Sequence, residues 1–447
     1  MSDAGRRVDE SRSRLDRTAA RLDSTLNRLG RLVFGDRWGL SVFLIAVVTA
    51  GLLWRVGIFI TDTYTVANAF VALTEGHLGV ERAVYGESLA TPGMSVVDGQ
   101  LYGRNYGQLV LSLPAYWLLS GLSALVDPRV LFAALWSLSV LGLAVVIGPI
   151  GDRRRSVVIT GSLFASVVFL ANVAVATDFD GTYLPLVALQ LTGIVAGGLL
   201  GVVLYRLLAT LQTTRVGVAT GVIGVLGTPV LLWAPIPKRH VFTTLFPLAA
   251  VATLALSRAS GSTPIRSTSQ RRWIHAFAYV FVGLTAWIHA AEGLLLLVVL
   301  VATDLLTGEF SWRPSRTTAA IVLVLGLSIV PLAATNVAIS GDPLDPPREL
   351  PAYNGGDLGG GGPPTDGPPA TDPTGPGEEA QSGGGLPNAF GFVVRAGGWL
   401  GSTLGPLTRL GSEVSAGLSV LFSEPSRGYQ TFVRSGYLAG GAEPDGT

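Results

Sequence analysis

The chain has 447 residues, of which 49% are hydrophobic and 14% are charged, and several of its apolar runs reach about 20 residues, the length that an α-helix needs to cross a bilayer. These values indicate an all-α polytopic membrane protein. The sequence contains no cysteine, which excludes disulfide bonds and cysteine-ligated metal, and its net charge of +1 gives no reason to expect a nucleic-acid partner.

The N-terminal segment, residues 1–38, mixes arginines with apolar residues at helical spacing, namely Leu15, Leu22, Leu26, Leu29 and Val33. This pattern predicts an amphipathic helix on an anionic membrane surface, and a short coiled coil is the alternative. The segment lacks the apolar core and the cleavage site of a signal peptide, and we expect it to be cytoplasmic.

Residues 39–338 contain the apolar runs that we expect to form a bundle of about nine transmembrane helices. Seven of the runs predict single spans: Gly39–Ile60, Arg129–Gly148, Val157–Thr177, Pro185–Thr210, Gly217–Trp233, Val241–Leu256 and Thr317–Val337. The run Trp273–Thr303 is too long for one ordinary span, so we expect a tight helical hairpin whose turn holds His289, Glu292 and Gly293. Glycines in two neighbouring runs should allow close helix packing: Gly193, Gly197, Gly201, Gly217 and Gly221.

Charge distribution decides whether the apolar stretch "QLVLSLPAYWLL", which contains Pro114, crosses the membrane. If it does not cross, ten loop arginines lie on the cytoplasmic side and five cations lie outside, as the positive-inside rule requires. If it crosses, the bias reverses. We therefore expect a large first extracytoplasmic loop, residues 61–106, and an interfacial helix, residues 107–122.

The same topology places the chain after Val337 outside the membrane. Residues 339–386 become rich in Gly and Pro and are expected to form a disordered loop, because such a composition cannot bury enough apolar surface to offset its ordering entropy. Residues 387–447 return to an amphipathic period that is interrupted by charges, and this pattern favours an interfacial segment.

Asp62 follows the first predicted span directly, so its carboxylate is expected at the boundary between water and lipid. There it could act as a general base toward a hydroxyl acceptor while a lipid-linked phosphate leaves. The alternative is that Asp62 only caps the helix that follows it. Apolar residues of that helix would rest on the membrane: Ala67, Phe70, Val71, Leu73 and Leu78.

Two further groups of polar residues occur at expected outer helix ends. Asp178 and Asp180 could orient an acceptor or hold a divalent cation together with Asp62, although a turn of this kind is often only a polar loop. Lys238, Arg239 and His240 depart from the positive-inside trend. A lipid phosphate would explain these cations, and anchoring of the helix at the interface explains them equally well.

These features resemble the polytopic glycosyltransferases of the GT-C superfamily. The resemblance rests on an Asp after the first span, on a long first outer loop, and on the segment "DGQLYGRNYGQLVLSLPAYWLL" before the second span. It is greatest for the branch with protein O-mannosyltransferases and aminoarabinose transferases, and "TNVAISGDPLDPPREL" and "LFSEPSRGY" are similar to outer-loop segments of archaeal members. This chain differs from many members in two ways. It has Asp62 and Thr63 where they carry two acidic residues, and they usually continue into further spans.

The resemblance implies a multi-pass enzyme of the cell membrane that transfers a sugar, with inversion, from a polyprenyl- or dolichyl-phosphate donor. It makes Asp62 the catalytic residue. Substrate-binding candidates are Tyr64, Asp98, Tyr102, Arg104, Asp178, Asp180, Lys238, Arg239 and His240. The alternative function is a non-catalytic scaffold, a truncated relative or a transporter. A transporter would carry polar groups at mid-membrane depth, where the predicted spans show little besides Arg55 and Gln190.

Overall fold

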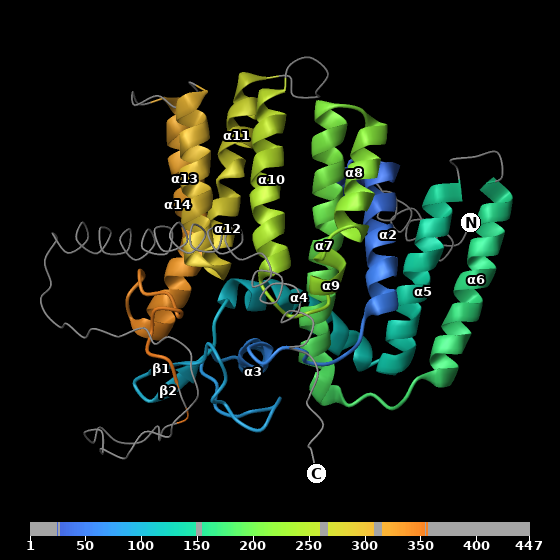
Figure 1. Cartoon of the computed structure of the whole chain (residues 1–447), viewed down its shortest axis with the longest axis horizontal. Coiled ribbons are helices and arrows are strands. Elements are labelled where there is room, and N and C mark those ends of the chain that lie inside the picture. The colour runs from blue at the N-terminus through green and yellow to red at the C-terminus, as the bar shows by residue number, and fades with distance from the viewer. Residues whose placement is uncertain are drawn as a thin grey trace, which may run out of the picture. The chain divides into compact units, whose positions relative to one another are not determined.

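The computed structural model describes residues 25, 27–148, 154–259, 267–307, 315–353 and 355, and this part of the chain is predominantly helical (Figure 1). Within it, five helices are long and apolar enough to cross a membrane, or six if a bent pair at the N-terminal side counts as one span. The mostly helical structure is consistent with the predicted all-α membrane protein. The larger number of about nine spans remains a prediction.

The elements follow one another in this order: α2 (Arg37–Leu53), α3 (Thr63–Thr74), β1 (Ser95–Val97), β2 (Gln100–Tyr102), α4 (Tyr106–Ser123), α5 (Pro128–Ile147), α6 (Arg154–Val175), η2 (Gly181–Tyr183), α7 (Leu184–Leu211), α8 (Thr214–Leu226), α9 (Val230–Trp233), α10 (His240–Arg258), α11 (Thr268–Ala278), α12 (Val280–Ile288), α13 (Ala290–Leu306) and α14 (Arg316–Ser340). Five of the predicted spans agree with helices α5, α6, α7, α10 and α14 to within a few residues.

The first predicted span ends earlier than expected, because α2 stops at Leu53 and the chain then unwinds. The buried side chain of Gln190 on α7 forms hydrogen bonds with this unwound segment. Its Oε1 accepts a hydrogen bond from Trp54 Nε1 at 2.9 Å, and its Nε2 donates to the carbonyl oxygen of Arg55 at 3.0 Å. The two polar residues that stood out in the predicted spans thus belong to one local arrangement at a helix end.

The predicted span Gly217–Trp233 is also wrong as a single helix. It is divided between α8 and the short α9, with Gly227, Thr228 and Pro229 between them. Pro229 has no N–H group to continue the hydrogen-bond ladder of α8, which explains the break.

The long run from Trp273 forms α11, α12 and α13, and α12 and α13 pack against each other and meet at His289. His289 is the N-cap residue of α13, and Glu292 lies in its first turn. The predicted helical hairpin and its turn therefore agree with the structure. A capping box between Ser267 and Gln270 starts the first arm.

One polar group in this region was not expected. The Asp304 side chain of α13 is only 1% exposed and binds residues of two other helices. It accepts hydrogen bonds from Arg258 Nη2 at 2.6 Å and from Tyr279 Oη at 2.6 Å, and its Oδ2 lies 2.8 Å from His275 Nε2. This group, which we call the Asp304 cluster, ties α10, α11 and α13 together near the end of the bundle away from Asp62.

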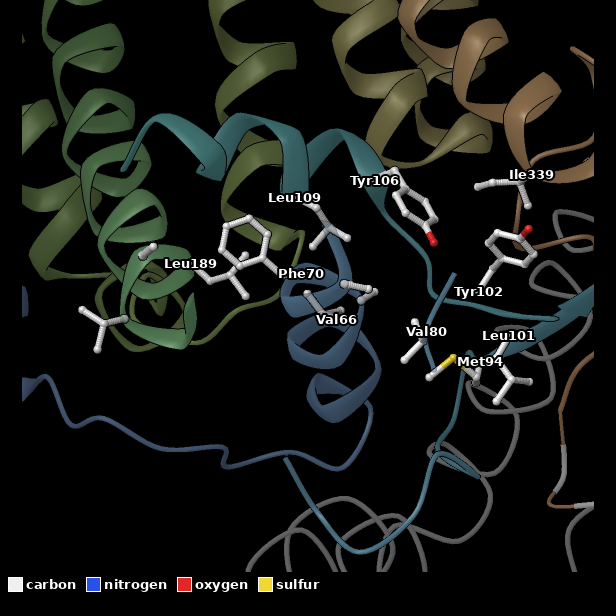
Figure 2. Packing of buried hydrophobic residues seen from close by; sticks show 14 of the residues in the cluster. Val66, Phe70, Val80, Met94, Leu101, Tyr102, Tyr106, Leu109, Leu189 and Ile339 are labelled. Atoms are coloured by element: carbon white, nitrogen blue, oxygen red, sulfur yellow. The ribbon is translucent and has the colours of Figure 1, made fainter. Parts of the chain in front are cut away.

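Helix α4 lies across the ends of the bundle helices and contacts α3, α7 and α12 (Figures 1 and 2). Its buried residues include Leu109, Ser112 and Leu119, whereas Trp117 and Leu118 on the same helix are exposed. The interfacial position of this helix stays a prediction, and the exposed Trp is of the kind found at membrane interfaces.

Helix α3 forms where the sequence predicts it, but its apolar face does not rest on the membrane. Ala67 and Phe70 are completely buried and Val71 is nearly so. Phe70 and Val66 pack beside Leu109 of α4 and Leu189 of α7 (Figure 2). Because these side chains are buried against α4 and α7, this face of α3 forms part of a folded cap over the bundle end and does not rest on the membrane.

The cap is completed by a hairpin of the first outer loop and by the chain that follows α14. Strands β1 and β2 form an antiparallel hairpin whose turn contains Asp98 and Gly99, both with positive φ. The chain after α14 continues along β1, where Val96 N donates to the carbonyl oxygen of Pro351 at 2.9 Å. Residues 339–353, the first part of the predicted disordered loop, are thus ordered in this cap. The remainder of that loop, apart from residue 355, and the C-terminal segment 387–447 lie outside the described residues.

The glycines of α7 and α8 pack as the sequence predicts. A Cβ atom added to Gly221 would lie 2.8 Å from the carbonyl oxygen of Gly201, and one added to Gly193 would lie 2.2 Å from that of Ala234. These contacts leave no room for a side chain.

The described part of the N-terminal segment forms a helix, Asn27–Phe34, that bends by 75° from α2. Asp36 caps α2 at the bend and also accepts a hydrogen bond from Tyr205 Oη at 2.7 Å. Leu29 and Leu32 on the bent helix are exposed, as expected of an amphipathic surface helix. Residues 1–24, with Leu15 and Leu22, and also Leu26 lie outside the described residues.

Candidate functional site

Asp62 occupies the N-cap position of α3, but its side chain makes no capping hydrogen bond. Its carboxylate instead binds two cations that are distant in the sequence. Asp62 Oδ2 lies 2.6 Å from Arg104 Nη2, and Asp62 Oδ1 lies 2.7 Å from Lys238 Nζ. The alternative in which Asp62 only caps a helix is therefore not supported by the geometry.

The local structure explains how the two cations reach Asp62. Arg104 follows β2 and precedes Asn105, which has a positive φ of 61° and turns the chain into α4. Gly93 lies against the Arg104 side chain, and an added Cβ there would be 2.5 Å from its Cζ. Lys238 ends the "PIPK" turn that leads into α10. Proline restricts this turn, which directs the ammonium group toward Asp62.

A second pair of charges neighbours the first. Arg239 Nε lies 3.2 Å from Glu292 Oε1, and His289 Nδ1 lies 3.7 Å from the same oxygen. Arg348, which follows α14, contacts His289 Nε2 through its guanidinium. We refer to Asp62, Arg104, Lys238, Arg239, His289, Glu292 and Arg348 together as the charged cluster.

The electrostatics of the charged cluster are dominated by its cations. Burial, followed by the charges of Arg239 and Arg348, lowers the pKa of His289 to about 4, so this imidazole is neutral near pH 7. Burial, followed by the charges of Arg239 and Arg104, also lowers the pKa of the Arg348 guanidinium. Four cations thus surround two carboxylates in a partly buried setting, and the excess of positive charge favours an anionic ligand.

The other residues singled out in the sequence are not members of the charged cluster, although His240 lies near it. Asp98 is an exposed residue of the hairpin turn. Tyr102 is a core residue whose hydroxyl donates to Gln100 Oε1 at 3.0 Å, and Tyr64 packs at the edge of a small apolar group with Ala67. His240 lies beside Lys238 and Arg239 in the sequence, with its ring 5.0 Å from that of Trp233.

Asp178 and Asp180 are not brought to Asp62. Asp178 pairs with Arg129 at 2.8 Å, and its side chain is 99% exposed. Asp180 accepts a hydrogen bond from the backbone N–H of Thr182 at the start of η2. Among the described residues, no three His, Asp or Glu side chains are grouped closely enough to hold a metal ion. A divalent cation shared by these three aspartates is therefore not supported by their positions.

Three members of the charged cluster were not among the candidate site residues. The sequence placed His289 and Glu292 correctly in a turn at a helix end. Two ionisable residues in a turn between two spans are a signal that could have added them to the candidate site residues. Arg348 lies in the "PPREL" segment, which returns to the cap through pairing with β1. This long-range pairing has no local signal in the sequence.

Comparisons of the chain with protein-family models, with curated proteins and with solved structures find no match.

Proposed function

We propose that this protein is a membrane glycosyltransferase that moves a sugar from a polyprenyl- or dolichyl-phosphate donor to a hydroxyl acceptor on the extracytoplasmic face. The charged cluster is the observation that carries the proposal. Arginine and lysine side chains bind phosphate oxygens strongly, and a group of four of them near one end of the apolar helices would suit a lipid phosphate.

The distribution of cations supports the extracytoplasmic position of the cluster. Arginines are frequent at the opposite end of the bundle helices, where α6, α11 and α14 begin and α10 ends: Arg154, Arg155, Arg258, Arg271, Arg272 and Arg316. The positive-inside rule assigns that end to the cytoplasm, and with it the N-terminus. A cell membrane is the corresponding location, and the exposed apolar faces of the helices would contact its lipid.

The proposed reaction is a displacement at the anomeric carbon of the donor sugar. The acceptor oxygen forms a bond to that carbon while the bond from the carbon to the phosphate oxygen breaks, and the lipid phosphate leaves with the electron pair. The acceptor hydroxyl loses its proton to the Asp62 carboxylate. Arg104, Lys238, Arg239 and Arg348 bind the phosphate and stabilise the negative charge that develops on it.

Replacing Asp62 tests the proposal. The Asp62→Asn protein keeps the size of the side chain but loses the base, and a positioned general base typically contributes about 10²- to 10⁴-fold in rate. Asp178→Asn is a matched control, because it removes a carboxylate from an exposed ion pair at the same end of the bundle. Release of polyprenyl phosphate from a sugar-linked donor should fall to that extent in Asp62→Asn only. Equal turnover in both variants would remove Asp62 from the reaction.

A further inference from the structure

Both oxygens of the Asp62 carboxylate lie within ion-pair distance of cations. Arg104 donates to Oδ2, and the Lys238 ammonium lies 2.7 Å from Oδ1 and 2.8 Å from Oδ2. The three side chains are partly shielded from water, with exposed fractions of 24% for Asp62, 12% for Arg104 and 18% for Lys238. A carboxylate in this state cannot take a proton from an acceptor unless the ion pairs weaken.

The same two cations are suited to bind a phosphate group, so Asp62 and an anionic ligand compete for them. The cluster has capacity for such a ligand. Arg239 pairs with Glu292, whereas burial, followed by the charges of Arg239 and Arg104, lowers the pKa of the Arg348 guanidinium. The Nε atom of Arg104 is buried and has no hydrogen-bond partner among the residues that the structure describes. A buried donor without a partner is costly, and an incoming phosphate oxygen would satisfy it.

We propose that an anionic phosphate group displaces Asp62 from Arg104 and Lys238, and that this exchange releases the carboxylate. Asp62 therefore becomes a base only when a phosphate occupies the site. Resting on the proposed function, this exchange implies that the donor must bind before the acceptor can be deprotonated.

The exchange predicts that removing the Asp62 charge strengthens phosphate binding. The probe is farnesyl phosphate, and its affinity is measured by calorimetry for the protein in nanodiscs of uncharged phosphatidylcholine. Without the internal competitor, Asp62→Asn should bind farnesyl phosphate about tenfold more tightly than the original protein, a change of about 1.4 kcal/mol. Arg104→Gln and Lys238→Gln should bind it more weakly. Asp178→Asn, which removes a distant exposed carboxylate, should leave the affinity unchanged.

Unchanged or weaker binding in Asp62→Asn would overturn the exchange. Inorganic phosphate is tested alongside, and a tighter interaction with it as well would assign the effect to the phosphate group rather than to the lipid chain. Because no turnover is needed, the result stands even if the protein transfers no sugar. Conversely, loss of turnover in Asp62→Asn without tighter binding would support the general base and contradict the exchange.

A measurement on the original protein covers the case in which Asp62→Asn does not fold. Carboxyl groups are coupled to a small amine with a carbodiimide, in sodium sulfate or in sodium chloride at equal ionic strength, and the modified peptides are quantified by mass spectrometry. Sulfate is a tetrahedral dianion that binds the same cations. Asp62 should be modified several-fold more in sulfate than in chloride, with Asp178 unaffected. Equal modification of Asp62 in both salts would contradict the exchange.

Discussion

Replacing Asp304 by Asn should strongly destabilise the protein. The change removes the charge of a side chain that is 1% exposed, and it leaves the Arg258 guanidinium without its carboxylate. It also gives the neighbouring His275 and Tyr279 an amide in place of a strong acceptor. Breaking a buried ion pair from one side typically costs 3–5 kcal/mol.

The cost should lie at the lower end of that range, at about 3 kcal/mol. Arg258 is the last residue of α10 and its side chain is 26% exposed, so the stranded guanidinium can reach water or lipid headgroups. The free energy of unfolding is measured by titrating the protein in mixed micelles with dodecyl sulfate and following tryptophan fluorescence.

Two comparisons make this experiment decisive. Asp178→Asn breaks an ion pair whose carboxylate is 99% exposed and should have little effect on the free energy of unfolding. The double variant Arg258→Met with Asp304→Leu removes the stranded charge together with its partner and should recover much of the stability lost in Asp304→Asn. If Asp304→Asn were as stable as Asp178→Asn, the reasoning about this cluster would be refuted.

Three further predictions concern packing, pH and topology. Gly193→Ala should destabilise the protein by about 1–3 kcal/mol, because the added carbon would lie 2.2 Å from a carbonyl oxygen. Gly326→Ala has open space around the added carbon and should leave the stability unchanged. Thermal unfolding of the two variants tests this difference. The pKa of His289 is lowered to about 4 in the folded protein. Below pH 6.5, the ordinary pKa of histidine, the unfolded chain therefore binds a proton at this residue that the folded protein does not. Stability should therefore fall by about 2–3 kcal/mol as the pH drops from 6.5 toward 4, and a His289→Gln protein that shows the same fall in unfolding experiments would contradict this. Single cysteines replacing Glu87 and Arg215 should react with an impermeant maleimide from opposite sides of the membrane, without background from native cysteine, and labelling from one side would refute the topology.

Local patterns in the sequence were sufficient for most of the bundle. Helices α5 and α7 follow long apolar runs bounded by polar residues, so hydropathy alone locates their ends. The prediction of a single span over Gly217–Trp233 was wrong because Pro229 interrupts the helix. A hydropathy average does not capture the effect of one proline. Helix α2 ended early because Gln190, more than a hundred residues away, satisfies the unwound backbone beyond it.

Only part of the candidate site could be predicted, because the packing of distant segments decides the rest. The sequence identified Asp62, Arg104, Lys238 and Arg239 as polar residues at expected outer helix ends, and the structure places them in one cluster. Asp178 has the same local signature but lies with Arg129 instead. Which helix ends lie next to one another depends on the packing of the whole bundle, and no spacing along the chain encodes it.

The account depends most directly on whether the charged cluster supports sugar transfer. The deciding measurement is to incubate the purified protein in lipid with a set of polyprenyl-phosphate-linked sugars and hydroxyl acceptors, and to follow the lipid products by mass spectrometry. The account predicts formation of free polyprenyl phosphate together with a glycosylated acceptor, both absent when Asp62 is replaced by Asn. Intact donors throughout, with farnesyl phosphate shown not to bind to the protein, would contradict it.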